Sequence, residues 1–185
     1  MPRKLLLLIV IVSLGSHVFG LEGDTSLFPQ KLQLGETQLV RTGVGRMRRW
    51  MITGADVALY VPTGTDQENI LTDIPRALSF YYYVTISGEQ FARAAIETLR
   101  QNVDEAKLSR HADDIARMGS WFTTVRRGDR YLLTYKPGRG TTLAFNGEEK
   151  GTITDPEFAY IYFQIWLGSE PIDARMYASM TGSMP

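Results

Sequence analysis

The stretch GVGRMRRWMITGADVALYVP, residues 43–62, carries the pattern on which the fold depends. Every second residue over 55–61 is apolar. Because successive side chains of a strand point to opposite faces, one face of this segment should lie on a core. The strand-like pattern extends back over 39–61, is broken at 42–45 by a turn or bulge, and stops at Pro62, which has no amide donor. We therefore predict one long strand here.

A second segment, SGEQFARAAIETLRQN, residues 87–102, predicts an amphipathic helix. Ser87 lies three residues before Gln90, which is the spacing of a capping box. One helical stripe consists of Phe91, Ala94, Ala95, Thr98 and Leu99. A stripe of such small residues either leaves room for a ligand or lets the helix pack closely, and the pattern alone leaves both open.

The remaining segments place groups of strands before and after helices. We predict, in chain order, a short helix near 65–74, an aromatic strand over 76–86, a helical region over 104–122, a three-stranded meander over 130–153, a buried helix over 156–167, and a last short helix over 171–180. Asp155 and Pro156 mark the start of the buried helix and Gly168 its end. This order predicts an α+β fold with a layer of helices on a large, mostly antiparallel sheet.

Composition excludes several classes of function. Twenty basic and twenty acidic side chains cancel, so nothing favours a nucleic acid as partner. The absence of cysteine excludes disulfides, thiolate chemistry and Cys-ligated zinc. His111 lacks a second nitrogen ligand nearby in the sequence, so we interpret it as a surface or capping residue. We expect no metal and no cofactor.

The N-terminus has the pattern of an export signal. Arg3 and Lys4 precede the apolar run 5–14, which is shorter than the ~20 residues that span a bilayer. We predict a cleavable signal peptide over 1–20. After cleavage the protein should be periplasmic or secreted in a bacterium, without an integral membrane span. An uncleaved signal anchor is the alternative. An irregular lead-in over 21–37 and a single domain over 38–182 should follow.

Three parts of the chain resemble the chalcone isomerase fold family, especially its bacterial exported, chalcone-isomerase-like branch. The first part, 43–62, is the Gly-x-Gly turn with the strand that follows it. The second, 87–102, is the helix. The third consists of the hairpins, 128–153, and the last long helix, 163–173. The resemblance covers about residues 38–180. It implies an open-faced β-sandwich, in which a cleft lies between the helix 88–102 and the sheet.

The resemblance also implies where the family's catalytic groups would stand, and most of those groups are absent here. The tyrosine and lysine positions of the helix hold Phe91 and Ala94, its asparagine position holds Thr98, and the strand threonine position holds Ala55. The arginine position holds Met47, flanked by Arg46 and Arg48. Phenylalanine can neither donate a hydrogen bond nor take a proton. We therefore predict no catalytic residue for flavanone formation.

Three functions remain open from the sequence. The first is binding of a small apolar or amphipathic acid, like a fatty acid, in the cleft; the candidate ligand-binding residues are Arg46, Arg48, Ala55, Phe91, Ala94 and Thr98. The second is an isomerase or intramolecular lyase of another substrate, served by Thr98, an arginine, or the hydroxyl of Tyr82 or Tyr83. The third is a non-catalytic interaction module of the cell envelope.

Two observations separate these hypotheses. A cleft of ~300 Å³ or more favours the first two, and a filled core favours the third. An arginine of the cluster Arg46, Arg48 and Arg49 that reaches the cleft favours binding of a carboxylate, because a guanidinium group pairs with it bidentately. If these arginines stay outside, they form a solvated basic edge. The sequence does not give the oligomeric state.

Overall fold

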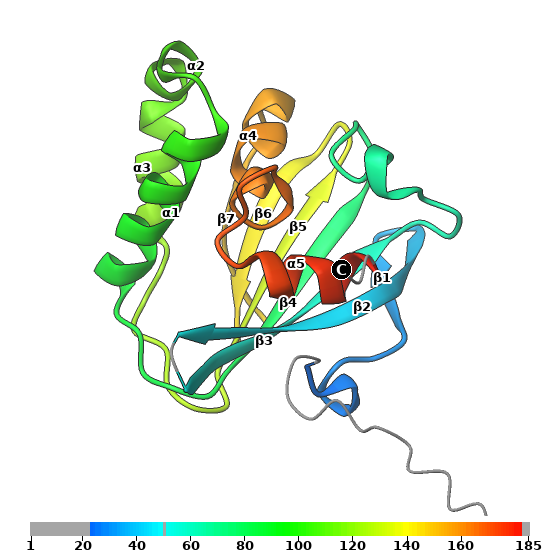
Figure 1. The fold of residues 1–185 in the computed structure, drawn as a ribbon. Coiled ribbons are helices and arrows are strands. Elements are labelled where there is room, and N and C mark those ends of the chain that lie inside the picture. The colour runs from blue at the N-terminus through cyan, green and yellow to red at the C-terminus, as the bar shows by residue number, and fades with distance from the viewer. Residues whose placement is uncertain (1–22, 50, 183–185) are drawn as a thin grey trace, which may run out of the picture.

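The computed structural model describes residues 23–49 and 51–182 (Figure 1). The predicted signal peptide, 1–20, lies outside the described residues. The described strands form one antiparallel sheet in which spatial order follows chain order. The strands are β1 (Lys31–Leu34), β2 (Thr37–Arg49), β3 (Ile52–Val61), β4 (Arg76–Tyr82), β5 (Arg130–Lys136), β6 (Gly140–Phe145) and β7 (Glu148–Ile153).

The α-helices gather on one side of this sheet (Figure 1). They are α1 (Gly88–Asn102), α2 (Glu105–Arg110), α3 (Ala112–Ser120), α4 (Pro156–Leu167) and α5 (Ala174–Thr181), with 3-10 turns η1 (Thr25–Leu27) and η2 (Gln67–Asn69). Helix α4 contacts β6, α5 contacts β2 and β3, and α1 packs on α3 and α4. The predicted α+β class, a large antiparallel sheet with a layer of helices, is confirmed.

Strand β3 separates two cores. Ala55, Val57 and Leu59 belong to the main core beneath the helices, whereas Ala58 and Tyr60 belong to a smaller cluster on the opposite face. The smaller cluster is completed by Phe28 and the chain around it, and Tyr60 Oη donates to the Pro29 carbonyl oxygen at 2.9 Å. The predicted alternation is therefore correct for this strand, with both of its faces buried.

The prediction of one long strand over 39–61 is wrong, because the chain reverses between Arg49 and Ile52 to form the β2–β3 hairpin. Each arm of a hairpin keeps the period of two, and no Gly or Asn marks the reversal, so the pattern runs through it unbroken. The predicted irregularity at 42–45 is present as a register shift between Arg41 and Gly43, and a second shift follows Met47.

Three other expectations need correction. The lead-in 21–37, expected to be irregular, contains β1, which pairs with β2. The helical region 104–122 is divided at His111, where the backbone leaves helical geometry (φ −104°, ψ 13°), into α2 and α3. The short helix expected near 65–74 is only the turn η2. Each is a local departure that hydrophobic spacing does not encode.

The glycines of the Gly-x-Gly motif allow α5 to lie directly on β2. A Cβ atom on Gly45 would lie 2.2 Å from the Met176 carbonyl oxygen, and one on Gly43 would lie 2.2 Å from that of Ser179. Any larger residue would therefore push the helix away from the strand. The motif serves close packing of a helix on a strand.

The predicted helix ends are confirmed. Ser87 and Gln90 form the capping box of α1, with the Ser87 hydroxyl accepting from the Gln90 amide. The Asp155 carboxylate accepts from the Glu157 amide at the start of α4, and Gly168 follows its last turn. Over 23–49 and 51–182, the structure contains no helix with both the length and the apolar character needed to cross a bilayer.

Candidate functional site

A cavity lies between α1, α4 and the main-core face of the sheet, where the sequence predicted a cleft. Its volume is about 50 Å³. Its walls are almost wholly apolar and consist of Met47, Phe80, Tyr82, Phe91, Ala94, Ala95, Phe122, Tyr131, Leu133, Leu143, Tyr162, Ile165, Trp166 and Ile172. The small stripe of α1 contributes Ala94 and Ala95 to one wall.

Aromatic rings fill most of the space at the N-terminal end of α1. The Phe91 ring stacks on Phe122 with centroids 5.2 Å apart and meets the edges of Tyr82 and Tyr131 at 5.5 and 5.9 Å. This cluster leaves far less than the ~300 Å³ that a ligand site usually offers. In this conformation the cavity accommodates a group of only a few atoms, so the volume criterion taken alone favours the interaction module over either cleft function.

Two tyrosine hydroxyls at the cavity have no hydrogen-bond partner among the residues that the structure describes. Tyr82 and Tyr162 are 3% and 1% exposed, both line the cavity, and neither hydroxyl makes a hydrogen bond within 23–49 and 51–182. By contrast, Tyr131 Oη accepts from the Thr123 amide at 2.8 Å. The oxygen atoms of Tyr82 and Tyr162 are not fully enclosed, since the fully enclosed side-chain atoms without a hydrogen-bond partner among the described residues are Arg76 Nε, His111 Nε2 and Thr141 Oγ1. The two tyrosine hydroxyls are therefore free to donate to an acceptor bound in the cavity.

Burial also fixes the protonation of both phenols. It raises the pKa of Tyr82 well above the usual 10, with smaller contributions from Tyr131 and Tyr162. Burial likewise raises the pKa of Tyr162. Both groups stay neutral at physiological pH, so they can donate a hydrogen bond to a ligand oxygen but cannot take a proton from a substrate.

The structure brings together only two of the six predicted site residues. Phe91 and Ala94 line the cavity. Ala55 is fully buried in the main core but does not line the cavity. Thr98 also lies outside its walls, and its hydroxyl donates to the Ala94 carbonyl oxygen at 2.9 Å, one helical turn back. Any role of Phe91 and Ala94 in binding stays a prediction.

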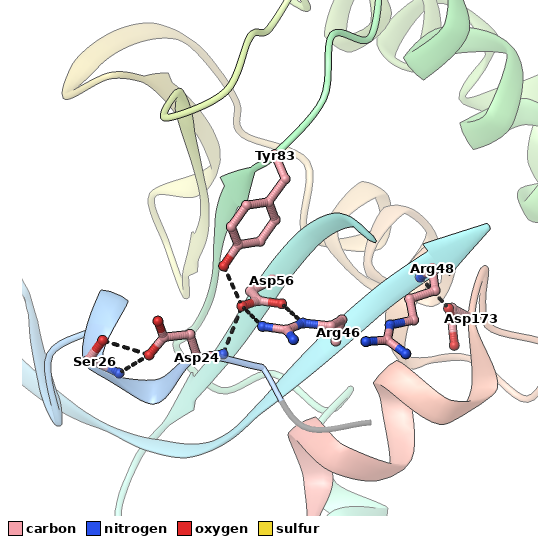
Figure 2. Close-up of polar contacts among 7 residues, drawn as sticks. All are labelled: Asp24, Ser26, Arg46, Arg48, Asp56, Tyr83 and Asp173. Carbon is pink, nitrogen blue, oxygen red and sulfur yellow. Dashed lines mark hydrogen bonds and ion pairs between the residues drawn. The ribbon is translucent and has the colours of Figure 1, made fainter. Parts of the chain in front are cut away.

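Arg46 does not line the cavity, contrary to its place among the candidate ligand-binding residues. It lies directly across the ladder from Asp56, on the face opposite Met47. Figure 2 shows the resulting ion pair, with Nε 2.8 Å from Asp56 Oδ1 and Nη2 2.9 Å from Oδ2. The register shifts on either side of Arg46 leave it on that face. A buried carboxylate in the facing strand already holds the guanidinium group.

Asp56 is fully buried and receives two further donors. Tyr83 Oη and the Asp24 amide donate to its Oδ2 at 2.8 and 2.7 Å (Figure 2). Hydrogen bonding to Asp56 raises the pKa of Arg46. Burial and the bond to Asp56 raise the pKa of Tyr83 to about 12. The complete set of partners identifies this cluster as structural.

Arg48 does not line the cavity either. Its side chain is exposed, and its backbone amide donates to Asp173 Oδ2 at 3.3 Å (Figure 2). The register shift after Met47 pairs Arg48 with Thr53 at the open end of the hairpin. The side chain of Arg49 lies outside the described part of the structure. The two placed arginines of the cluster therefore offer no cation to a ligand in the cavity.

His111 is buried, so the surface half of its interpretation is wrong, whereas its place at the C-cap of α2 and the N-cap of α3 agrees with the capping half. The break between α2 and α3 turns its ring toward the start of α4, with Nδ1 3.4 Å from Asp155 Oδ2 and Nε2 3.3 Å from Glu157 Oε2. His111, Asp114 and Asp155 each offer a ligand atom, and these three atoms lie within 4.8 Å of one another. The group lies away from the cavity walls and joins the starts of two helices.

Tyr162 is the site residue that the sequence analysis missed. Helix α4 is apolar almost all round, and this indicated burial without indicating which side chain faces a cavity. A usable signal was present, because a tyrosine inside such a helix must bury its hydroxyl. Tyr82 was considered only together with Tyr83, and the structure separates the two.

Comparison with known proteins agrees with this architecture. The family model described as chalcone isomerase-like matches residues 22–182, and a comparison with curated proteins finds no match. Among solved structures, the crystal structure of a fatty-acid binding protein of Arabidopsis thaliana has a TM-score of 0.63 and 15% sequence identity, and covers 83% of this chain and 90% of that chain. That likeness shows a shared fold. The family match, which extends over most of the sequence, establishes that the chain belongs to the chalcone isomerase-like family.

Proposed function

We propose that the protein binds a small apolar acid, like a fatty acid, in the cavity between α1, α4 and the sheet, and that it does not form flavanones. The observation that carries this proposal is the pairing of apolar walls with the two unpartnered hydroxyls of Tyr82 and Tyr162. A chain-like ligand with one polar end fits both features, because its tail replaces apolar contacts and its oxygen accepts the orphan donors. The fold shared with a fatty-acid binding protein supports the same class of ligand.

Binding is favoured over an isomerase or lyase because the described residues of the cavity walls include no proton acceptor for neutral pH. The polar side-chain groups of the walls are the hydroxyls of three tyrosines and the Trp166 indole. An enolate-forming reaction needs a base with a pKa near the operating pH. The raised pKa of Tyr82 and of Tyr162 places both far from that range.

The polar end of the ligand should lie at the tyrosines. Arg46 is held by Asp56 on the opposite face, and Arg48 is exposed at the hairpin. Two neutral phenols can both donate to one carboxyl oxygen, and this needs no buried cation. The site therefore accepts a carboxyl group through hydrogen bonds in place of an ion pair.

A ligand of this length requires the cavity to open, since about 50 Å³ is available and ~300 Å³ is needed. Helix α1 packs on α3 and α4, and its Phe91 ring contacts Phe122, which also lines the cavity. Rotation of these two rings, with an outward shift of α1, would enlarge the space without breaking a strand ladder. The described conformation is the closed form in this proposal.

We further propose that the protein acts outside the cytoplasm of a bacterium, in the periplasm or after secretion. The charged start and the apolar run 5–14 support this. Cell fractionation and N-terminal sequencing of the mature chain test it, and a chain that keeps residues 1–20 in the cytoplasmic fraction contradicts it.

Displacement of a fluorescent fatty acid by lauric acid tests the binding proposal. Ala94→Phe should reduce affinity at least about tenfold, because the added ring occupies the cavity wall. Ala106→Phe, the same change at an exposed position of α2, is the matched control and should bind like wild type. Native mass spectrometry of protein purified from cells should show a bound lipid. Absence of fatty-acid binding by the wild-type protein, or equal binding by Ala94→Phe, would contradict the proposal.

A further inference from the structure

The tip of the β2–β3 hairpin exposes large apolar side chains. Met51 is 96% exposed and Ile52 is 63% exposed, more than any other large apolar side chain in the described ranges 23–49 and 51–182. In the sequence, Trp50 and Met51 directly follow the pair Arg48 and Arg49. Neither residue contributes to the core, so another role must explain why apolar side chains are exposed at the tip.

A basic depression adjoins this tip. It has a volume of about 360 Å³ and is lined by Arg46, Ile52, Thr53, Tyr83, Val84 and Arg127. Both guanidinium groups lie over the Tyr83 ring, with the Arg46 and Arg127 Cζ atoms 5.9 and 5.8 Å from its centroid. Exposed Arg126 and Arg127, in the segment between α3 and β5, bring positive charge to the same end of the molecule.

The acidic groups nearby are already engaged. Asp56 is buried against Arg46, and Asp173 accepts from the Arg48 amide and caps α5. Asp129 accepts from the Arg126 amide and the Asn146 side chain. The guanidinium groups of Arg48 and Arg127 make no ion pair with the residues described on either side of position 50.

We propose that this tip docks on an anionic membrane surface. Exposed apolar side chains at the end of a hairpin enter the boundary between headgroups and acyl chains, and flanking arginines pair with lipid phosphates. The depression has room for a headgroup phosphate, and Arg127, which has no ion pair among the described residues, supplies its cation, since Arg46 is held by Asp56. Charge complementarity therefore selects anionic lipid over a neutral bilayer.

Docking at this tip would also place the cavity close to the bilayer. Met47, on the same strand as Arg48, lines the cavity wall. An apolar ligand could then pass between lipid and protein with little exposure to water. The docking proposal stands on the hairpin alone and does not require that the cavity binds a fatty acid.

The absence of native cysteine allows a clean fluorescence test. Full-length Met51→Cys carrying an NBD label is mixed with vesicles of equimolar phosphatidylglycerol and phosphatidylcholine, or of phosphatidylcholine alone. We expect a blue shift and a several-fold rise in emission only with the anionic vesicles. The same label at Ile96→Cys, an exposed position of α1, should not respond. Equal responses at both positions, or none at position 51, would overturn the proposal.

Charge reversal separates docking at the tip from attachment through the N-terminal segment, which every variant retains. In the labelled protein, Arg48→Glu with Arg127→Glu should weaken anionic vesicle binding at least about tenfold. The matched control, Arg93→Glu with Arg139→Glu at exposed positions elsewhere, should change it by no more than about twofold. Equal losses in both pairs would show a nonspecific charge effect and refute the proposed surface. Ala94→Phe should leave vesicle binding intact, so the two proposals can fail separately.

Discussion

Tyr82 and Tyr83 are neighbours in the chain, yet their hydroxyls lie in opposite situations on the two faces of the sheet. Tyr83 donates to the buried Asp56 carboxylate at 2.8 Å. Tyr82 lines the cavity and has no hydrogen-bond partner among the described residues. Tyr82 is the last residue of β4 and Tyr83 follows it directly, so the alternation of side chains at the end of the strand accounts for the difference.

The two faces of the sheet differ in whether their polar groups already have partners, and this separates a structural cluster from a candidate binding site. On the Asp56 face, a buried charge has two hydrogen bonds from Arg46 and one each from Tyr83 and the Asp24 amide, so nothing is left for a ligand. On the cavity face, the hydroxyls of Tyr82 and Tyr162 have no acceptor among the described residues. A cluster of charged residues is thus the less informative sign here, and the unpartnered neutral hydroxyls are the better one.

The largest expected effect is at Asp56. Asp56→Ala should lower the free energy of unfolding by about 3–5 kcal/mol, because it leaves Arg46 on the sheet without its partner. Urea denaturation followed by circular dichroism measures this. A loss below about 1 kcal/mol would show that the cluster is not structural and would reopen Arg46 as a ligand-binding residue.

The next effect concerns the contact that holds α5 on the cavity face. Gly45→Ala should cost about 1–3 kcal/mol, because its Cβ atom would collide with the Met176 carbonyl oxygen. Gly54→Ala is the control, since the nearest atom to its Cβ, the Met47 carbonyl oxygen, is 3.7 Å away. Thermal melts of both variants should differ clearly, and equal melting temperatures would contradict the close packing of α5.

The two tyrosines test the comparison itself. Tyr83→Phe should cost about 1–2 kcal/mol, because it removes a hydrogen bond to a charged group. Tyr82→Phe should change the free energy of unfolding by less than about 0.5 kcal/mol, because no protein bond is lost. Urea titrations of the two variants side by side decide the matter, and the reverse order would refute the assignment of the two faces.

The smallest expected effect is at the exposed arginine of the hairpin. Arg48→Ala should alter the free energy of unfolding by no more than about 0.5 kcal/mol, as is usual for an exposed charge without an ion pair. Chemical denaturation provides the measurement. A loss comparable to that of Asp56→Ala would mean that Arg48 has a buried partner in solution.

Much of the fold was predictable because hydrophobic spacing and helix caps are local signals. The alternation in β3, the capping box at Ser87 and the start of α4 at Asp155 all follow from neighbouring residues. The hairpin between Arg49 and Ile52 was missed because its turn carries none of the usual turn residues. Strand β1 was missed because its four residues gain stability only from pairing with β2.

The site was less predictable than the fold because it depends on contacts between distant segments. Arg46 was a reasonable candidate until Asp56, ten residues later, came to lie opposite it. Only the fold brings Tyr162 of α4 together with Tyr82 of β4 at one cavity. The small residues of α1 were recognised in advance, yet neighbouring aromatic rings determine how much space they leave.

The most direct test of the central claim is a titration with lauric acid of the double variant Tyr82→Phe, Tyr162→Phe and of Tyr83→Phe. Calorimetry at neutral pH compares both with the wild-type protein. If the cavity hydroxyls hold the polar end of the ligand, the double variant should bind at least about tenfold more weakly, since two hydrogen bonds of about 1 kcal/mol each are lost. Tyr83→Phe should bind like wild type. Unchanged affinity in the double variant, or an equal loss in Tyr83→Phe, would contradict the assignment of the cavity as the ligand site.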